Sequence, residues 1–116
     1  MKITQRQKGA VAILDVVGQI TFDSTPDLRE KILASFAKQT AVLVNLAGVG
    51  YMDSSGIATL VEGLKAAQGK KAGFGLVGLT KNTRSVLELV RLDKVFKIFE
   101  TEEDALRQLP GAAVPS

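Results

Sequence analysis

The chain of 116 residues contains no cysteine, no histidine and no tryptophan. Without cysteine it can form no disulfide, no thiolate metal site and no thiol nucleophile. Without histidine it lacks the commonest general base and the commonest nitrogen ligand for metals. A catalytic serine activated by a histidine is therefore excluded. The spacing of the lysines does not identify one that could act as the base instead. We predict a protein that is not an enzyme, with no catalytic residue, no metal and no cofactor.

Long apolar runs and concentrated basic stripes are missing as well. No segment approaches the length that spans a membrane, and the first residues, 1–6, carry no long apolar run. The 15 Lys and Arg residues outnumber the 12 Asp and Glu residues, but they are scattered, with few aromatic residues for base stacking. The composition therefore indicates a cytoplasmic protein with no membrane insertion and no direct contact with nucleic acid.

The apolar residues make up 46% of the chain, which is enough for one packed core. Segments 2–6 and 10–17 flank a polar turn at 7–9 and predict an opening hairpin, because the second segment is rich in β-branched residues. The next apolar runs are nearly continuous, which is typical of central strands that are buried on both faces. These later strands, the last of them a short edge strand, are expected at 41–46, 72–77 and 97–99.

About four helices are predicted between and after these strands. Thr25 is expected to cap the first helix, with Pro26 and Asp27 in its first turn and a buried stripe behind them. The other helices are expected at 55–67, after Thr80 and after a capping box at 101–104.

The order of these elements predicts an α/β domain with a mixed sheet of four to five strands opened by a hairpin. After the hairpin the strands should be mostly parallel, because helices alternate with them. Loops that leave parallel strands meet at one rim of a sheet, where partners and ligands of such folds bind. The segments 21–25, 51–55 and 78–82 should share that rim.

The most informative stretch is Tyr51-Met52-Asp53-Ser54-Ser55-Gly56, between a predicted strand and a predicted helix. It places two serines near a helix N-terminus, where free backbone N–H groups and the helix dipole favour a phosphate. Asp and Ser are also the preferred helix caps and Gly permits a tight turn, so a purely structural role explains the same residues. One cap would suffice, however, whereas this turn offers three polar side chains in succession.

The predicted helix at 55–67 has two different faces when its residues are spaced at the helical angle. One face is apolar and should meet the core. The opposite face is expected to carry small and little-charged residues, which leave room for another protein to pack closely, although a merely tolerant surface has the same composition. Gly63 is expected towards the border of this outer face. A glycine in the middle of a helix destabilises it relative to alanine, so its presence indicates a packing or functional role. The outer face is predicted to contain Ala58, Thr59, Glu62 and Ala66.

Three features together carry a resemblance to a known family. Gly18-Gln19-Ile20 precedes the first helix, the run 42–46 precedes the segment 51–56, and the tail segment is 91–99. In this order they resemble a STAS domain of the bacterial anti-sigma factor antagonists, over about residues 10–108. The most specific piece is Met52-Asp53-Ser54-Ser55-Gly56. We accordingly expect one STAS domain over 1–109 and a flexible C-terminal tail over 110–116.

The resemblance implies partner switching. In such families the unmodified antagonist binds an anti-sigma factor that is also a serine kinase, which releases the sigma factor. Phosphorylation of the serine after the aspartate breaks the complex, and a serine phosphatase restores it. In this sequence that serine is Ser54, and Ser55 is expected to cap the helix. The residues expected to bind the partner are Asp53, Ser54, Ser55, Gly56, Ala58, Thr59, Glu62, Thr21 and Asp23.

One departure from the family pattern concerns the first loop. The family often has an acidic residue directly after the triplet Gly18-Gln19-Ile20, where this chain has Thr21, with Asp23 two residues later. If that carboxylate orients the kinase's nucleotide or the target hydroxyl, Asp23 is its candidate substitute. Two rival functions remain: a STAS scaffold that is never phosphorylated, and an accessory subunit of a lipid transport system.

Overall fold

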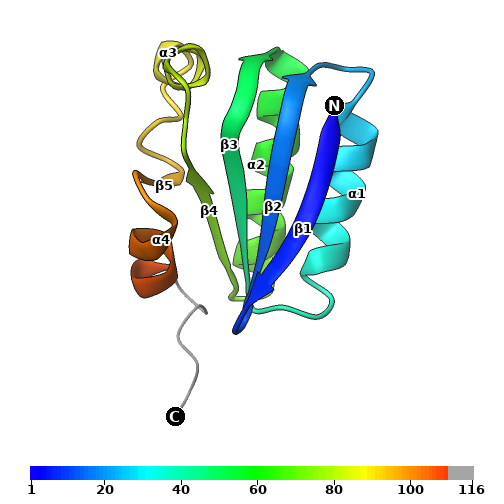
Figure 1. The fold of residues 1–116 in the computed structure, drawn as a ribbon, viewed down its shortest axis with the longest axis vertical. Helices are drawn as coiled ribbons and strands as arrows, with labels where there is room; N and C mark the ends of the chain where they lie inside the picture. The colour runs from blue at the N-terminus through cyan, green and yellow to red at the C-terminus, as the bar shows by residue number, and fades with distance from the viewer. Residues whose placement is uncertain (110–116) are drawn as a thin grey trace.

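The computed structural model describes residues 1–109, and the tail predicted at 110–116 lies outside the described residues. Strands and helices alternate after the first two strands (Figure 1). The elements are β1 (Lys2–Lys8), β2 (Val11–Ile20), α1 (Thr25–Ser35), β3 (Ala41–Met52), α2 (Ser54–Gly69), β4 (Gly73–Val77), α3 (Lys81–Leu89), β5 (Lys97–Phe99) and α4 (Glu102–Gln108).

All five strands described lie in one sheet, in the order β1-β2-β3-β4-β5. Strand β1 runs antiparallel to β2, whereas β2, β3, β4 and β5 are mutually parallel. The predicted hairpin, the mixed sheet and the parallel order after the hairpin are therefore confirmed. The parallel strands point the same way, and β2 and β3 end together at the edge of the sheet where α3 also lies (Figure 1). Strand β4 ends earlier, where Val77 pairs with Asn45, and the chain continues from there to α3.

The helices cover the two faces of the sheet unequally. Helices α1 and α2 pack beside each other on one face, over the larger hydrophobic cluster, which includes Leu14, Val44 and Leu60. Helix α4 covers the other face, where Ala105 and Leu109 close a smaller cluster. Every residue of β4 is buried, as its apolar sequence predicted.

The caps of α3 and α4 agree with the sequence, whereas that of α1 does not. Thr80 and Thr101 accept hydrogen bonds from backbone N–H groups three residues later, as predicted. Thr25, the expected cap of α1, is instead the first helical residue, and Ser24 occupies the cap position without capping. The Ser24 hydroxyl accepts a hydrogen bond from the N–H of Thr21 at 2.9 Å, so it closes the preceding loop.

Strand β3 is twice as long as the predicted segment 41–46. The pairing of β2 with β3 continues past two register shifts, between Asp15 and Gln19 of β2, up to the pair Ile20 and Met52. Val49 and Met52 remain buried in this extension, which the interrupting glycines concealed in the sequence. The added length carries β3 to the rim and places Asp53 directly at the start of α2.

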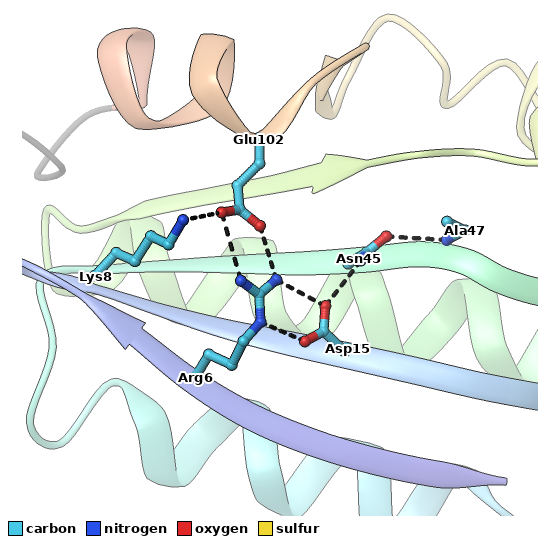
Figure 2. Close-up of polar contacts among 6 residues, drawn as sticks. All are labelled: Arg6, Lys8, Asp15, Asn45, Ala47 and Glu102. Carbon is cyan, nitrogen blue, oxygen red and sulfur yellow. Dashed lines mark hydrogen bonds and ion pairs between the residues drawn. The ribbon is translucent and has the colours of Figure 1, made fainter.

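A charged network ties α4 to the sheet (Figure 2). Arg6 donates to both carboxylate oxygens of Asp15, at 2.6 and 3.0 Å, and to Glu102 at 2.7 Å. Lys8 also contacts Glu102 at 2.7 Å, and Asn45 donates to Asp15 at 2.8 Å. Hydrogen bonds from Arg6 lower the pKa of Asp15 and, together with Lys8, that of Glu102, while the two acids raise the pKa of Arg6.

These pKa shifts predict a stability contribution that acid removes. Carboxylates whose pKa is lowered on folding stabilise the protein above their unfolded pKa of about 4 and lose that contribution as the pH falls. The Arg6→Met variant should lose about 1 kcal/mol of unfolding free energy at neutral pH, since the ions are partly exposed. Urea unfolding of this variant and the wild type should show the difference shrinking below pH 4.

Lys65→Met is the control for this experiment, because Lys65 is exposed on α2 and forms no ion pair within residues 1–109. Its stability should match that of the wild type at both pH values. If the deficit of Arg6→Met were the same in acid as at neutral pH, packing of the arginine stem would explain it and the ionic account would be wrong.

Candidate functional site

The three loops predicted to share a rim are joined there by hydrogen bonds. The N–H of Asp53 donates to the carbonyl of Ile20 at 3.1 Å, which links the loop before α2 to the end of β2. On the other side, Thr80 donates to the carbonyl of Val49 at 2.9 Å and Asn82 donates to that of Gly50 at 3.1 Å. The rim prediction is therefore confirmed.

Asp53 is the polar centre of this rim. Its Oδ1 accepts hydrogen bonds from the N–H of Ser55 at 2.9 Å, from the N–H of Gly56 at 3.2 Å and from the Ser55 hydroxyl. Its Oδ2 accepts from the N–H of Phe22, in the loop between β2 and α1, at 3.2 Å. The hydrogen bond from the Ser55 side chain, followed by those from the backbone, lowers the pKa of Asp53. The carboxylate therefore stays ionised and holds two loops together.

This arrangement corrects the expected cap of α2. Asp53, in extended backbone conformation, is the N-cap, and the helix begins at Ser54. Ser55 was expected to cap the helix, but its hydroxyl donates to Asp53 instead. A carboxylate accepts several N–H groups at once, so it is the better cap of the two.

Ser54 is the first residue of α2, and it is exposed. Its hydroxyl has no hydrogen-bond partner within residues 1–109, in contrast to the hydroxyls of Ser55 and Thr59. It stands where the backbone N–H groups of the first helical turn point outwards. The hydroxyl is therefore accessible to a reagent or enzyme approaching from solvent.

A shallow groove of about 240 Å³ runs between α1 and α2 next to this turn. Arg29 of α1 and Glu62 of α2 form an ion pair of 2.6 Å across it, and each side chain is about half exposed. Three exposed or partly exposed positions expected to bind a partner line the groove, namely Ser55, Ala58 and Glu62.

Two other positions named from the sequence lie deeper than expected. The prediction that Thr59 lies on the outer face is wrong, because it is only 5% exposed and its hydroxyl donates to the carbonyl of Ser55 at 2.9 Å. Helix α1 packs against this side of α2, which a pattern within one helix does not reveal. Gly56 is also buried, and a Cβ there would lie 2.5 Å from Met52 Cγ.

Gly63 also faces the core. A Cβ at this position would lie 2.8 Å from the ring of Phe74 and 3.0 Å from Ile32. The glycine is therefore explained by close packing of α2 on the sheet and on α1, and not by an outer docking face.

Thr21 and Asp23 lie in the loop between β2 and α1. Thr21 is partly buried and supplies the N–H that Ser24 accepts, whereas Asp23 is exposed. Both line an open depression of about 510 Å³, together with Gln19, Ser24, Asp27 and Met1. Within residues 1–109 no three Asp, Glu, His or Cys side chains are grouped so that they could hold a metal ion.

Sequence reasoning assigned no role to two aromatic residues that are exposed at this rim. Phe22 is 72% exposed and Tyr51 is 50% exposed. Neither belongs to an apolar stripe of a helix or strand, so periodicity gave no reason to expect either of them inside. The signal that could have identified Phe22 was the presence of a large apolar residue in a loop, between the polar residues Thr21 and Asp23.

The fold and this turn define a small α/β domain with an exposed serine at the rim of a mostly parallel sheet. The STAS domain model matches residues 2–105, so the chain belongs to the STAS domain family. The resemblance stated from the sequence is therefore confirmed. No helix within residues 1–109 has the length and hydropathy of a membrane span.

Known relatives include proteins named anti-sigma factor antagonists. The chain is 32% identical to the anti-sigma-F factor antagonist RsfB of Mycobacterium tuberculosis, over 97% of this chain and 92% of RsfB. It is 30% identical to an anti-sigma factor antagonist from Mycobacterium paratuberculosis, whose crystal structure covers 91% of each chain with a TM-score of 0.83.

The antagonist SpoIIAA of Bacillus shares the fold at 17% identity. Its unphosphorylated form covers 92% of this chain and 95% of its own, with a TM-score of 0.79. Its phosphorylated form covers 92% and 98%, with a TM-score of 0.72.

Proposed function

We propose that this protein is an anti-sigma factor antagonist that works by partner switching. In its unmodified form it binds an anti-sigma factor that is also a serine kinase. Phosphorylation of Ser54 releases the partner, and a serine phosphatase restores binding. The proposed role requires a cytoplasmic location, where the sigma factor acts. The observation that carries the proposal is the exposed position of Ser54 as the first residue of α2, with a hydroxyl that has no hydrogen-bond partner within residues 1–109.

The local charges support a switch that leaves the fold intact. A phosphoserine adds roughly −1.5 to −2 charge at neutral pH, and the N-terminus of α2 accommodates that charge while it remains in water. In a protein interface the same group loses its hydration and lies next to the ionised Asp53. The modification therefore opposes association far more than it opposes folding.

The proposed contact surface combines the turn, the groove and the first loop. Asp53, Ser54 and Ser55 form its centre, Ala58 and Glu62 its extension along α2, and Thr21 and Asp23 its margin. Gly56 and Thr59 support this surface from within, since both are buried. The relative RsfB, whose name assigns it an anti-sigma factor as target, agrees with such a role.

The test is incubation with ATP and each anti-sigma factor kinase encoded in the same genome, followed by intact mass and peptide mapping. We expect a single added phosphate, located on Ser54. The Ser55→Ala variant is the matched control and should still be modified, whereas Ser54→Ala should not. Absence of any phosphate with every kinase would reject the switch and favour a scaffold that is never phosphorylated.

A further inference from the structure

Phe22 differs from the other phenylalanines of this chain in its exposure. The four other phenylalanines are at most 9% exposed and contribute to the two hydrophobic clusters, whereas Phe22 is 72% exposed. A phenyl ring exposed to this extent gains little from burial in the free protein, and such rings are typical anchors of protein interfaces.

The position of Phe22 is fixed from both sides by hydrogen bonds. Its N–H donates to Asp53 Oδ2 at 3.2 Å, and its carbonyl accepts from the Thr25 hydroxyl at 3.2 Å. Thr25 and Pro26 line the groove between α1 and α2, and Asp53 precedes Ser54. Phe22 is therefore connected to the groove at one end and to the Ser54 turn at the other.

The two oxygens of Asp53 have separate partners. Oδ1 caps α2 through the N–H groups of Ser55 and Gly56, whereas Oδ2 accepts only from Phe22 among residues 1–109. The cap of α2 thus needs one oxygen, and the second holds the loop that carries the exposed ring.

We infer that Phe22 is the apolar anchor of the partner interface and that Asp53 Oδ2 positions it beside Ser54. This inference rests on the proposed function. The occupant is the anti-sigma factor, which must offer an apolar recess for one phenyl ring close to the site that receives the Ser54 hydroxyl. Continuity of Phe22 with the Ser54 turn favours this occupant over a second copy of the chain, since a kinase has to reach the same place.

The first test is the affinity of Phe22→Ala for the anti-sigma factor kinase, measured by calorimetry. Loss of the ring should weaken binding about tenfold, as expected for an interface anchor. In the kinase reaction the KM for this variant should rise with kcat unchanged, because the ring binds the ground state and the transition state equally. Leu89→Ala is the matched control, since Leu89 is 83% exposed on α3, and it should bind like the wild type.

The second test separates the positioning role of Asp53 from its capping role. In Asp53→Asn the amide oxygen can still cap α2, but the NH₂ group cannot accept the hydrogen bond from Phe22. We expect faster hydrogen exchange of the Phe22 amide, unchanged helicity and a loss of affinity similar to that of Phe22→Ala. Combining both substitutions should add little further loss, because they act through one contact.

The outcomes separate the two proposals. If the wild type binds its kinase and Phe22→Ala binds equally well, or if Leu89→Ala loses as much affinity, the anchor is rejected while the proposed function stands. If Asp53→Asn leaves the exchange of the Phe22 amide unchanged, the positioning role is rejected. If the wild type binds none of the kinases, the proposed function itself is wrong.

Discussion

Replacing Ser54 with aspartate should weaken binding of the anti-sigma factor kinase on the order of 100-fold, which corresponds to about 3 kcal/mol. The new carboxylate would stand next to the ionised Asp53 and would have to lose its water in the interface. Calorimetric titration of the kinase with the variant measures this loss directly. Because Ser54 is exposed and makes no hydrogen bond within residues 1–109, the fold should be unaffected.

Ser54→Ala is the companion variant. It should bind as tightly as the wild type and remain bound in the presence of ATP, since it has no hydroxyl to modify. Thermal unfolding of both variants should match that of the wild type within about 0.5 kcal/mol, as for other exposed positions. Undiminished affinity of Ser54→Asp for the kinase would contradict the switch.

Replacing Gly63 with alanine should destabilise the domain by about 1–3 kcal/mol, although alanine is the better helix former. The added methyl group would lie 2.8 Å from the ring of Phe74. That ring is buried and packs near Phe36 and Phe96, at centroid distances of 6.3 and 6.4 Å, so it cannot move aside freely. The free energy of unfolding in urea measures the effect.

Gly69 offers the same substitution in the same helix without the clash. It is the last residue of α2, and a Cβ there would meet nothing within 4 Å. Gly69→Ala should therefore be neutral or stabilise the protein by up to about 1 kcal/mol. A stabilising effect of Gly63→Ala would show that Phe74 and Ile32 can move to accommodate the methyl group. Close packing would then not explain the glycine.

The fold was predictable where local signals and tertiary packing agree. Thr80 and Thr101 cap helices because their hydroxyls reach a backbone N–H in the same turn, which sequence alone specifies. The true length of β3 was hidden, since the glycines at 48 and 50 interrupt its apolar pattern while the neighbouring strand supplies the pairing. Register shifts depend on contacts between strands, and no single strand encodes them.

The residue types of the site could be predicted from the sequence, but the burial and the contacts of its side chains could not. The succession Asp53-Ser54-Ser55 indicated a polar turn at a helix start, and the structure has one there. The burial of Thr59 and Gly63 depends on the side-by-side packing of α1 and α2, which helical periodicity cannot express. The hydrogen bond between Phe22 and Asp53 joins residues 31 positions apart, so it was beyond any local pattern.

The most direct test of the switch uses the unaltered chain in its two states. Wild-type protein carrying one phosphate on Ser54 and the same preparation after phosphatase treatment are each titrated with the anti-sigma factor kinase. We predict that the phosphorylated sample binds on the order of 100-fold more weakly and that phosphatase treatment restores full affinity. Equal affinity of the two samples would contradict the account.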